Sequence, residues 1–149
     1  MTFAEQLASL RRAIRRHLTE KLGARTNRPF NQLLALKGIS EGARRQAALA
    51  ERLLVDAPAA SRLVDRLEED GLVLRRAGED RRCVRLELTA AGERELSFLV
   101  DALRELDGEL GEYLPASEVT ELQRLMGKLQ EGLVTRQSGD GAPPTDGCE

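Results

Sequence analysis

Apolar residues recur at helical spacing near both ends of the chain. Leu7, Leu10, Ile14 and Leu18 repeat every three or four positions, which predicts an amphipathic helix over about residues 3–22. Two more stripes predict long helices in the C-terminal part, because each keeps this spacing over several turns. The first stripe consists of Leu96, Leu99, Val100, Leu103, Leu106 and Leu110, and the second of Val119, Leu122, Leu125, Met126, Leu129 and Leu133.

Two shorter helices are predicted between these long ones. The segment "PFNQLLALKG" (29–38) begins with a proline, which suits the first turn of a helix, and Gly38 is expected to end it. The segment "RRQAALAERLL" (44–54) predicts the next helix, and Ser40 is expected to cap it.

A fourth helix follows, and its two faces differ in character. Asp56 is expected to cap this helix, Pro58 suits its first turn, and Gly71 is expected to end it. One face is apolar and carries Ala60, Leu63, Val64 and Leu67. The opposite, exposed face carries Pro58, Ser61, Arg62, Asp65 and Glu69.

The next two segments predict a β-hairpin. "LVLRR" (72–76) and "CVRLEL" (83–88) are joined by the charged turn "AGEDR" (77–81), and Thr89 is expected to cap the helix that follows. The element order is four helices, a hairpin and two helices. It predicts a mainly α fold with a small β-hairpin wing, that is, a winged helix-turn-helix with a helical dimerisation region. Such a fold presents one helix to the DNA major groove while the hairpin reaches sideways.

This order also predicts how the chain is divided. Residues 29–88 are expected to form the winged helix-turn-helix DNA-binding region, and residues 1–28 and 89–136 the helical dimerisation region. Residues 137–149 are polar and rich in glycine and proline, which predicts a disordered tail.

Charge is distributed unevenly along the 149 residues. Residues 1–100 hold 19 Lys and Arg against 14 Asp and Glu, a net charge of +5, whereas residues 101–149 hold 4 against 11, a net charge of −7. A basic front and an acidic back indicate that the front meets an anion. No segment approaches the roughly 20 apolar residues of a membrane span, and no signal peptide is visible. Two cysteines, Cys83 and Cys148, predict neither a disulfide framework nor a metal site, so we expect a cytoplasmic, reduced protein without metal or cofactor.

The segment "AALAERLLVDAPAASRLVDRLEEDGLVLRRAGEDRRCVRLELTAAG" (47–92) resembles the winged-helix core of the MarR/SlyA family of bacterial transcriptional regulators. The most specific pieces are "SRLVDRLEEDGLV", the Asp-x-Arg of "DRR" and the closing "LTAAG". The turn before the fourth helix departs from the family, because Leu54 stands where the family usually places glycine. The resemblance implies a homodimer on a pseudo-palindromic double-stranded DNA site, most often as a repressor that a small-molecule effector releases.

The resemblance also implies which residues read DNA. Arg82 matches the wing arginine that enters the minor groove, where a narrow A·T-rich groove favours a guanidinium, and Asp80 is placed to brace it. Arg62 matches a base-contacting position on the fourth helix, and arginine can bond guanine O6 and N7 together. Ser61 and Pro58 line the same face.

Further arginines are candidate phosphate contacts, which position a protein without specifying sequence. We expect Asp65 to orient Arg62 or Arg66 and not to meet DNA itself. The candidate phosphate contacts are Arg44, Arg45, Arg75, Arg76, Arg81 and Arg85.

Two regulatory hypotheses remain open. His17 and Arg16 lie on the first helix, near the place where the family binds effectors, and could contact a small anionic or phenolic molecule, although the pattern favours a surface or packed structural role for His17. Cys83 lies beside basic residues that favour the thiolate, so a thiol-based redox switch is an alternative. A single histidine argues against a zinc site.

Other classes of protein fit the sequence less well. It has no phosphate-cradling glycine motif and no paired nucleophile and base, which argues against an enzyme. A helical interaction module that has lost DNA binding stays possible, but such a module is expected to lose exposed arginines such as Arg62 and Arg82. An RNA-binding winged helix would lack stacking aromatics.

Overall fold

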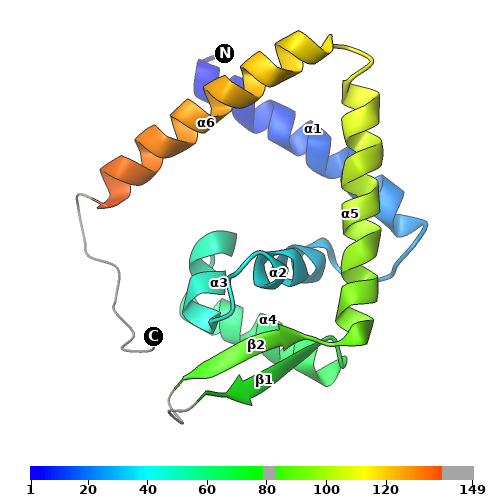
Figure 1. Cartoon of the computed structure of the whole chain (residues 1–149), viewed down its shortest axis with the longest axis vertical. Helices are drawn as coiled ribbons and strands as arrows, with labels where there is room; N and C mark the ends of the chain where they lie inside the picture. The colour runs from blue at the N-terminus through cyan, green and yellow to red at the C-terminus, as the bar shows by residue number, and fades with distance from the viewer. Residues whose placement is uncertain (79–82, 139–149) are drawn as a thin grey trace. The chain divides into compact units, whose positions relative to one another are not determined.

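The computed structural model describes residues 1–78 and 83–138. Over these residues the fold is mainly α with one antiparallel hairpin, as predicted (Figure 1). In chain order the elements are α1 (Phe3–Gly23), α2 (Phe30–Ser40), α3 (Gln46–Leu53), α4 (Ala57–Glu69), β1 (Val73–Ala77), β2 (Val84–Leu88), α5 (Ala90–Leu110) and α6 (Ala116–Ser138).

The chain divides into two compact units, residues 1–104 and 105–149, and each is described by itself. The core of the first unit is built almost entirely from aliphatic side chains, as the low aromatic content requires. The largest fully buried side chains are Leu33, Leu36, Leu49, Leu67, Leu72, Leu86, Leu99, Val64 and Val73. They come from α2, α3, α4, the hairpin and α5, so the helix-turn-helix and its wing share one core.

The turn between α3 and α4 is tight and unusual. Leu54 ends α3 in the left-handed conformation, with φ 56° and ψ 44°, and its side chain is 89% exposed. Two residues later, Asp56 caps α4: its Oδ1 accepts the Ala59 N–H at 2.7 Å. Pro58 lies in the first turn of α4, as predicted. The turn therefore forms although Leu54 stands where the family usually places glycine. Leucine is strained in this left-handed conformation, whereas glycine is not.

The hairpin is anchored at its base to α4 and α5. Gly71, with φ +73°, follows α4, and the Thr89 hydroxyl donates to its carbonyl at 2.6 Å. The same hydroxyl oxygen accepts the Gly92 N–H at 3.0 Å, which confirms Thr89 as the cap of α5. On the other side, the Leu86 N–H donates to the Arg44 carbonyl at 2.7 Å and ties β2 to the segment before α3.

Two predictions about the end of α2 are wrong. Gly38 does not end the helix but lies buried inside it, where an added Cβ would come within 3.1 Å of Leu49 Cδ1. Its role is close packing of α2 against α3. Ser40 does not cap α3, because it is the last residue of α2 and its hydroxyl donates to the Lys37 carbonyl. Gly42, with φ +114°, lies in the turn that follows α2.

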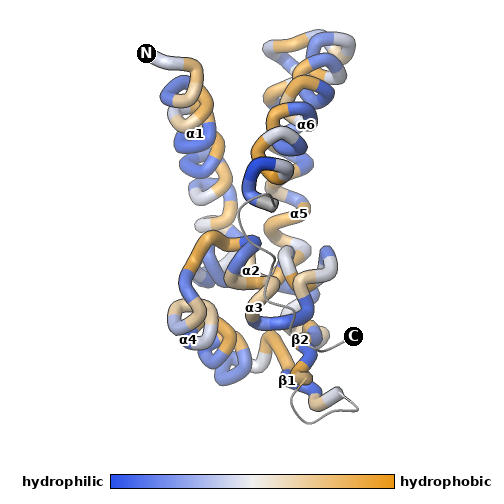
Figure 2. The backbone as a smooth tube through the Cα atoms, turned by 90° about the vertical axis from the view of Figure 1, so that its left-hand side faces the viewer, coloured by the Kyte–Doolittle hydropathy of each residue, from blue (hydrophilic) through white to orange (hydrophobic). Residues whose placement is uncertain are grey.

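The second unit contains the end of α5 and the whole of α6. The helix α6 continues through Gln137 and Ser138, two residues into the predicted tail, and residues 139–149 lie outside the described part of the chain. From Ala116 to Gln137 no residue is buried. Apolar residues nevertheless recur along this helix (Figure 2). The exposed ones are Leu122, Leu125, Met126, Leu129, Leu133 and Val134. Across the described residues, no helix is both long and apolar enough to span a membrane.

Candidate nucleic-acid interface

The helix α4 separates a core face from a solvent face. Ala60, Val64 and Leu67 are buried, whereas Pro58 and Arg62 are exposed and Ser61 is half-buried. The spacing of three and four residues between these positions produces the two faces, as the sequence predicts. Side chains on the solvent face are not packed in the core. Pro58, Ser61 and Arg62 can therefore contact a partner molecule.

Three predicted phosphate contacts lie together beside the wing. Arg44 and Arg45 belong to the segment before α3, Arg85 belongs to β2, and all three border one groove of about 260 Å³ with Gly42 and Ala48. The hydrogen bond from Leu86 to the Arg44 carbonyl brings this segment and β2 side by side. Three guanidinium groups around one groove form a basic patch suited to a phosphate backbone.

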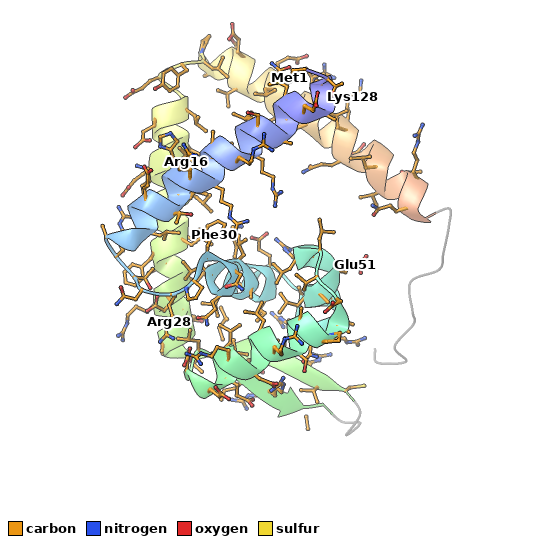
Figure 3. The ribbon with its side chains drawn as sticks, turned by 180° about the vertical axis from the view of Figure 1, so that it is seen from behind. Met1, Arg16, Arg28, Phe30, Glu51 and Lys128 are labelled. Carbon is orange, nitrogen blue, oxygen red and sulfur yellow. The ribbon has the colours of Figure 1, made fainter. Side chains whose placement is uncertain are left out.

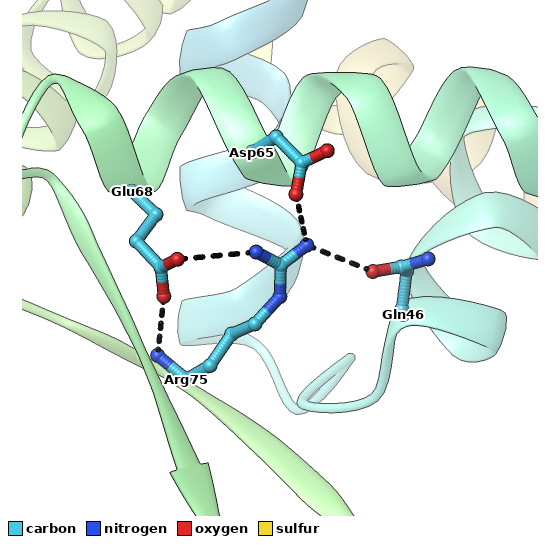
Figure 4. A network of polar contacts seen from close by, with 4 residues as sticks. All are labelled: Gln46, Asp65, Glu68 and Arg75. Atoms are coloured by element: carbon cyan, nitrogen blue, oxygen red, sulfur yellow. Dashed lines mark hydrogen bonds and ion pairs between the residues drawn. The ribbon is translucent and has the colours of Figure 1, made fainter.

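Arg75 is engaged inside the protein, not offered to a phosphate (Figure 4). Its Nη2 donates to Asp65 Oδ1 at 2.7 Å and to Gln46 Oε1 at 3.3 Å, and its Nη1 donates to Glu68 Oε1 at 3.2 Å. Its backbone N–H donates to the same Glu68 carboxylate at 3.3 Å. The prediction that Asp65 orients Arg62 or Arg66 is therefore wrong, because the carboxylate faces β1 and holds Arg75.

The tip of the wing is only partly described. Arg76 Nε lies 2.6 Å from Glu87 Oε2 across the hairpin, and the two side chains are 63% and 49% exposed. The Gly78 N–H donates to the Cys83 carbonyl at 2.6 Å, so the two ends of the turn are held together. The predicted site residues Asp80, Arg81 and Arg82 lie outside the described residues.

A second arginine-rich groove borders α4. It has a volume of about 1030 Å³ and is bordered by the connection between α1 and α2, by α4 and by Glu95 of α5. Its arginines are Arg25, Arg28, Arg62 and Arg66.

Two of these arginines are paired within the groove. Arg28 donates to Asp70 at 2.7 Å, and Arg66 lies 3.4 Å from the same carboxylate. The side chain of Gln32 also borders this groove, is only 5% exposed, and has an Oε1 without a hydrogen-bond partner. A buried acceptor without a donor is costly to the folded protein. The sequence alone did not indicate this groove, because its residues come from segments far apart in the chain.

The predicted effector residues His17 and Arg16 are both exposed on α1 and are not among the residues that border this groove. Figure 3 shows Arg16 on α1, with Arg28 and Phe30 near the start of α2. The guanidinium of Arg15 lies 5.1 Å from the centre of the Phe30 ring, a cation–π distance that ties α1 to α2. Within the described residues, no group of three or more His, Cys, Asp or Glu could hold a metal ion.

Cys83 directly precedes β2 and is half-buried. It is disulfide-bonded in the structure, unlike the reduced thiol that the sequence predicts. The other cysteine of the chain, Cys148, lies outside the described residues. A reactive thiolate at this position is therefore a property of the reduced protein only.

A tight helical pair, an exposed arginine on its second helix and a hairpin anchored to both define a winged helix-turn-helix DNA-binding protein. The comparisons with known proteins agree. The model of the MarR family matches residues 26–82. The apo crystal structure of MarR from E. coli is 27% identical, with coverage of 87% of this chain and 97% of that one and a TM-score of 0.72.

Two further structures are similar in fold. A MarR family protein from Bacillus stearothermophilus is 23% identical and covers 88% of this chain and 92% of its own, with a TM-score of 0.74. MepR of S. aureus, solved with ethidium bromide bound, is 19% identical and covers 89% and 97%, with a TM-score of 0.59. The family match and these structures support a regulator of the MarR type. The chain is a DNA-binding transcription regulator and not an enzyme, which confirms the expectation from the sequence.

Proposed function

We propose that this chain acts as a homodimer that binds a pseudo-palindromic operator and represses transcription until an effector releases it. The observation that carries the proposal is the solvent face of α4, where Pro58, Ser61 and Arg62 stand free of the core. The major groove of B-DNA admits one α-helix, and an arginine there can recognise guanine. The hairpin would then lie over the neighbouring minor groove, with Arg82 inserted.

Phosphate contacts would position the protein on DNA. The groove bordered by Arg44, Arg45 and Arg85 lies beside the wing, and Arg76 lies on the hairpin itself. Each contact of this kind releases counterions, so operator binding should weaken steeply as salt increases.

The homodimer is supported by the apolar face of α6. A 23-residue helix without a buried residue between Ala116 and Gln137 has little reason to stay folded in isolation, because most helical stability in proteins comes from packing. Leu122, Leu125 and Leu129 are each about 40% exposed on this helix. A second copy is the simplest partner that buries such a stripe, and two-fold pairing matches a pseudo-palindrome.

An effector is supported by the arginine-rich groove beside α4. Its guanidinium groups, two of which share the Asp70 carboxylate, favour an anion, so the groove suits a small acid. MepR binds ethidium, an organic cation, which shows that a ligand of this fold need not be anionic. The pair His17 and Arg16 remains an alternative place for an effector. Release would follow from a change in the separation of the two α4 helices.

One experiment tests the proposal directly. DNA bound by the protein is selected from a random pool, and the winner is titrated by fluorescence anisotropy at two salt concentrations. We expect a pseudo-palindrome with A·T-rich wing positions and salt-sensitive binding in the nanomolar range. Arg62→Ala should weaken binding and relax base preference at one position, by roughly 1–3 kcal/mol. Arg12→Ala, which removes the same charge from α1, is the matched control.

Two other outcomes would change the assignment. Weak binding without an enriched motif would favour a helical interaction module that retains the winged fold. Binding that appears only with reductant would favour the thiol-based alternative at Cys83. A regulator of chromosomal DNA is expected to act in the cytoplasm.

A further inference from the structure

Arg75 occupies an unusual position in the hairpin. On β1 it follows Val73 on the inward face, because alternate residues of a strand point to the same side. Val73 is fully buried, and the cross-strand partner of Arg75 is the buried Leu86. Arg75 therefore lies on the inward face of the wing at the edge of the apolar core, and its side chain is only 25% exposed.

The guanidinium of Arg75 joins three elements of the DNA-binding region (Figure 4). Asp65 and Glu68 belong to α4, and Gln46 is the first residue of α3. Two of the three acceptors are carboxylates, which make the stronger, charge-assisted hydrogen bonds. The side chain of Arg75 thus adds polar contacts between the wing and α4 to the shared apolar core and the contacts at the base of the hairpin.

The same contacts shape the charge of α4. Asp65 lies three residues after Arg62, and both Asp65 and Glu68 are partly exposed, at 54% and 42%. Unpaired carboxylates at these positions would repel DNA phosphates. Arg75 pairs with both carboxylates and draws them toward β1. The charge that this surface presents to DNA is then set by the basic side chains of α4 and the wing.

We propose that Arg75 is a positioning residue that holds the wing in register with α4, so that major-groove and minor-groove reading act as one unit. The inference rests on the proposed function, since it concerns how the two reading elements cooperate on an operator. Arg75 itself does not touch DNA. A guanidinium presents several donors in a rigid fork, whereas a lysine ammonium is a point charge, so lysine cannot replace it in three contacts at once.

The test compares Arg75→Gln and Arg75→Lys with the wild-type dimer on the selected operator. Both variants should bind about tenfold more weakly than wild type, whereas a phosphate contact would tolerate lysine. The salt slope of binding should stay unchanged, because no phosphate contact is lost. Loss of a phosphate contact would lower that slope by about 0.9.

A double-mutant cycle provides the second readout. Arg82→Ala should weaken binding of the wild type at least tenfold but have a much smaller effect in the Arg75→Gln background, because an unregistered wing no longer reads its groove. Full additivity of the two substitutions, or a lysine variant that binds like wild type, would overturn the inference and leave the proposed function intact. Failure of the wild type to select any sequence would overturn both.

The fold of each variant is checked by circular dichroism and thermal unfolding. If Arg75→Gln does not fold, Asp65→Asn replaces it in the same cycle, because it weakens the shortest of the contacts and keeps the arginine. In that cycle the expected result is a smaller effect of Arg82→Ala in the Asp65→Asn background, and full additivity of the two substitutions would overturn the inference.

Discussion

The carbonyl oxygen of Leu72 lies directly against Gly92 in the first turn of α5. A Cβ added at Gly92 would be only 2.1 Å from that oxygen, which is far inside van der Waals contact. The same carbonyl accepts the Thr89 N–H at 3.1 Å. The base of the wing and the start of α5 are therefore joined through backbone atoms, which cannot move aside as a flexible side chain can.

This contact makes Gly92→Ala strongly destabilising. We expect a loss of about 3 kcal/mol in the free energy of unfolding, since the clash is with backbone and must be relieved by shifting α5 from the hairpin. Gly108→Ala on the same helix is the control: nothing lies within 4 Å of its added Cβ, and alanine should stabilise the helix interior by roughly 0.5–1 kcal/mol. Urea denaturation measures both. Equal stability of the two variants would contradict the close contact.

Leu54→Gly should stabilise the protein. Leu54 has φ 56° and is 89% exposed, so glycine removes left-handed strain of roughly 1–2 kcal/mol and loses little buried area. Part of the gain is offset by the greater freedom of glycine in the unfolded chain, so the net effect should be about 1 kcal/mol or less. Thermal unfolding measures it, with Leu54→Val as the opposite case, because a β-branched residue tolerates this conformation poorly.

Acid should weaken the junction between α2 and α3. Hydrogen bonds from Lys37 and then Arg52 lower the pKa of Glu41 from its ordinary value of 4.5. A lowered folded-state pKa means that the contribution of Glu41 to stability is present above pH 4.5 and is lost as the pH falls through the folded-state value. Glu41→Gln should therefore reduce stability at about pH 7, and the difference from the wild type should shrink as the pH falls through the folded-state pKa, as measured by denaturant unfolding. A pH-independent difference would contradict the pairing.

Arg82→Ala should weaken operator binding at least tenfold while the dimer stays folded, because a guanidinium in a narrow minor groove gains from its enhanced negative potential. Anisotropy at matched salt measures the effect. Arg12→Ala, which removes the same charge from α1, serves as the control. Unchanged affinity of the Arg82 variant would remove the wing from the interface.

Cys83→Ser tests the redox alternative. If oxidation at Cys83 regulates DNA binding, peroxide or reductant should change the affinity of the wild type, and the serine variant should not respond. Anisotropy titrations with and without each reagent decide the question. An equal response in both proteins would assign the effect to another group, and no response in either would leave the cysteine without a regulatory role.

The elements themselves could be predicted from local pattern. Asp56 and Thr89 cap their helices as expected, because a cap depends on a hydrogen bond within three residues of sequence. Gly38 misled the prediction for the opposite reason. Gly38 is needed because α3 packs closely against it, and α3 lies outside any short stretch of sequence around position 38.

The candidate site shows the same division. The exposed face of α4 follows from helical spacing, so Pro58 and Arg62 could be found in advance. The tie between Asp65 and Arg75 spans two elements and depends on how the hairpin folds back on α4. One signal was available: Arg75 alternates with the apolar Val73, so the strand pattern places it on the inward face. An inward-facing arginine needs acceptors, and the nearest carboxylates lie on the preceding helix.

The bare leucine face of α6 has a consequence for the amount of protein in a cell. If that face is completed only by a second copy, the folded population follows mass action, and its unfolding midpoint rises with protein concentration. Newly made chains that have not met a twin would display an unpacked helix to proteases. The cell would then keep no lasting pool of single copies, and the regulator would disappear sharply once its synthesis falls below the level that sustains pairing.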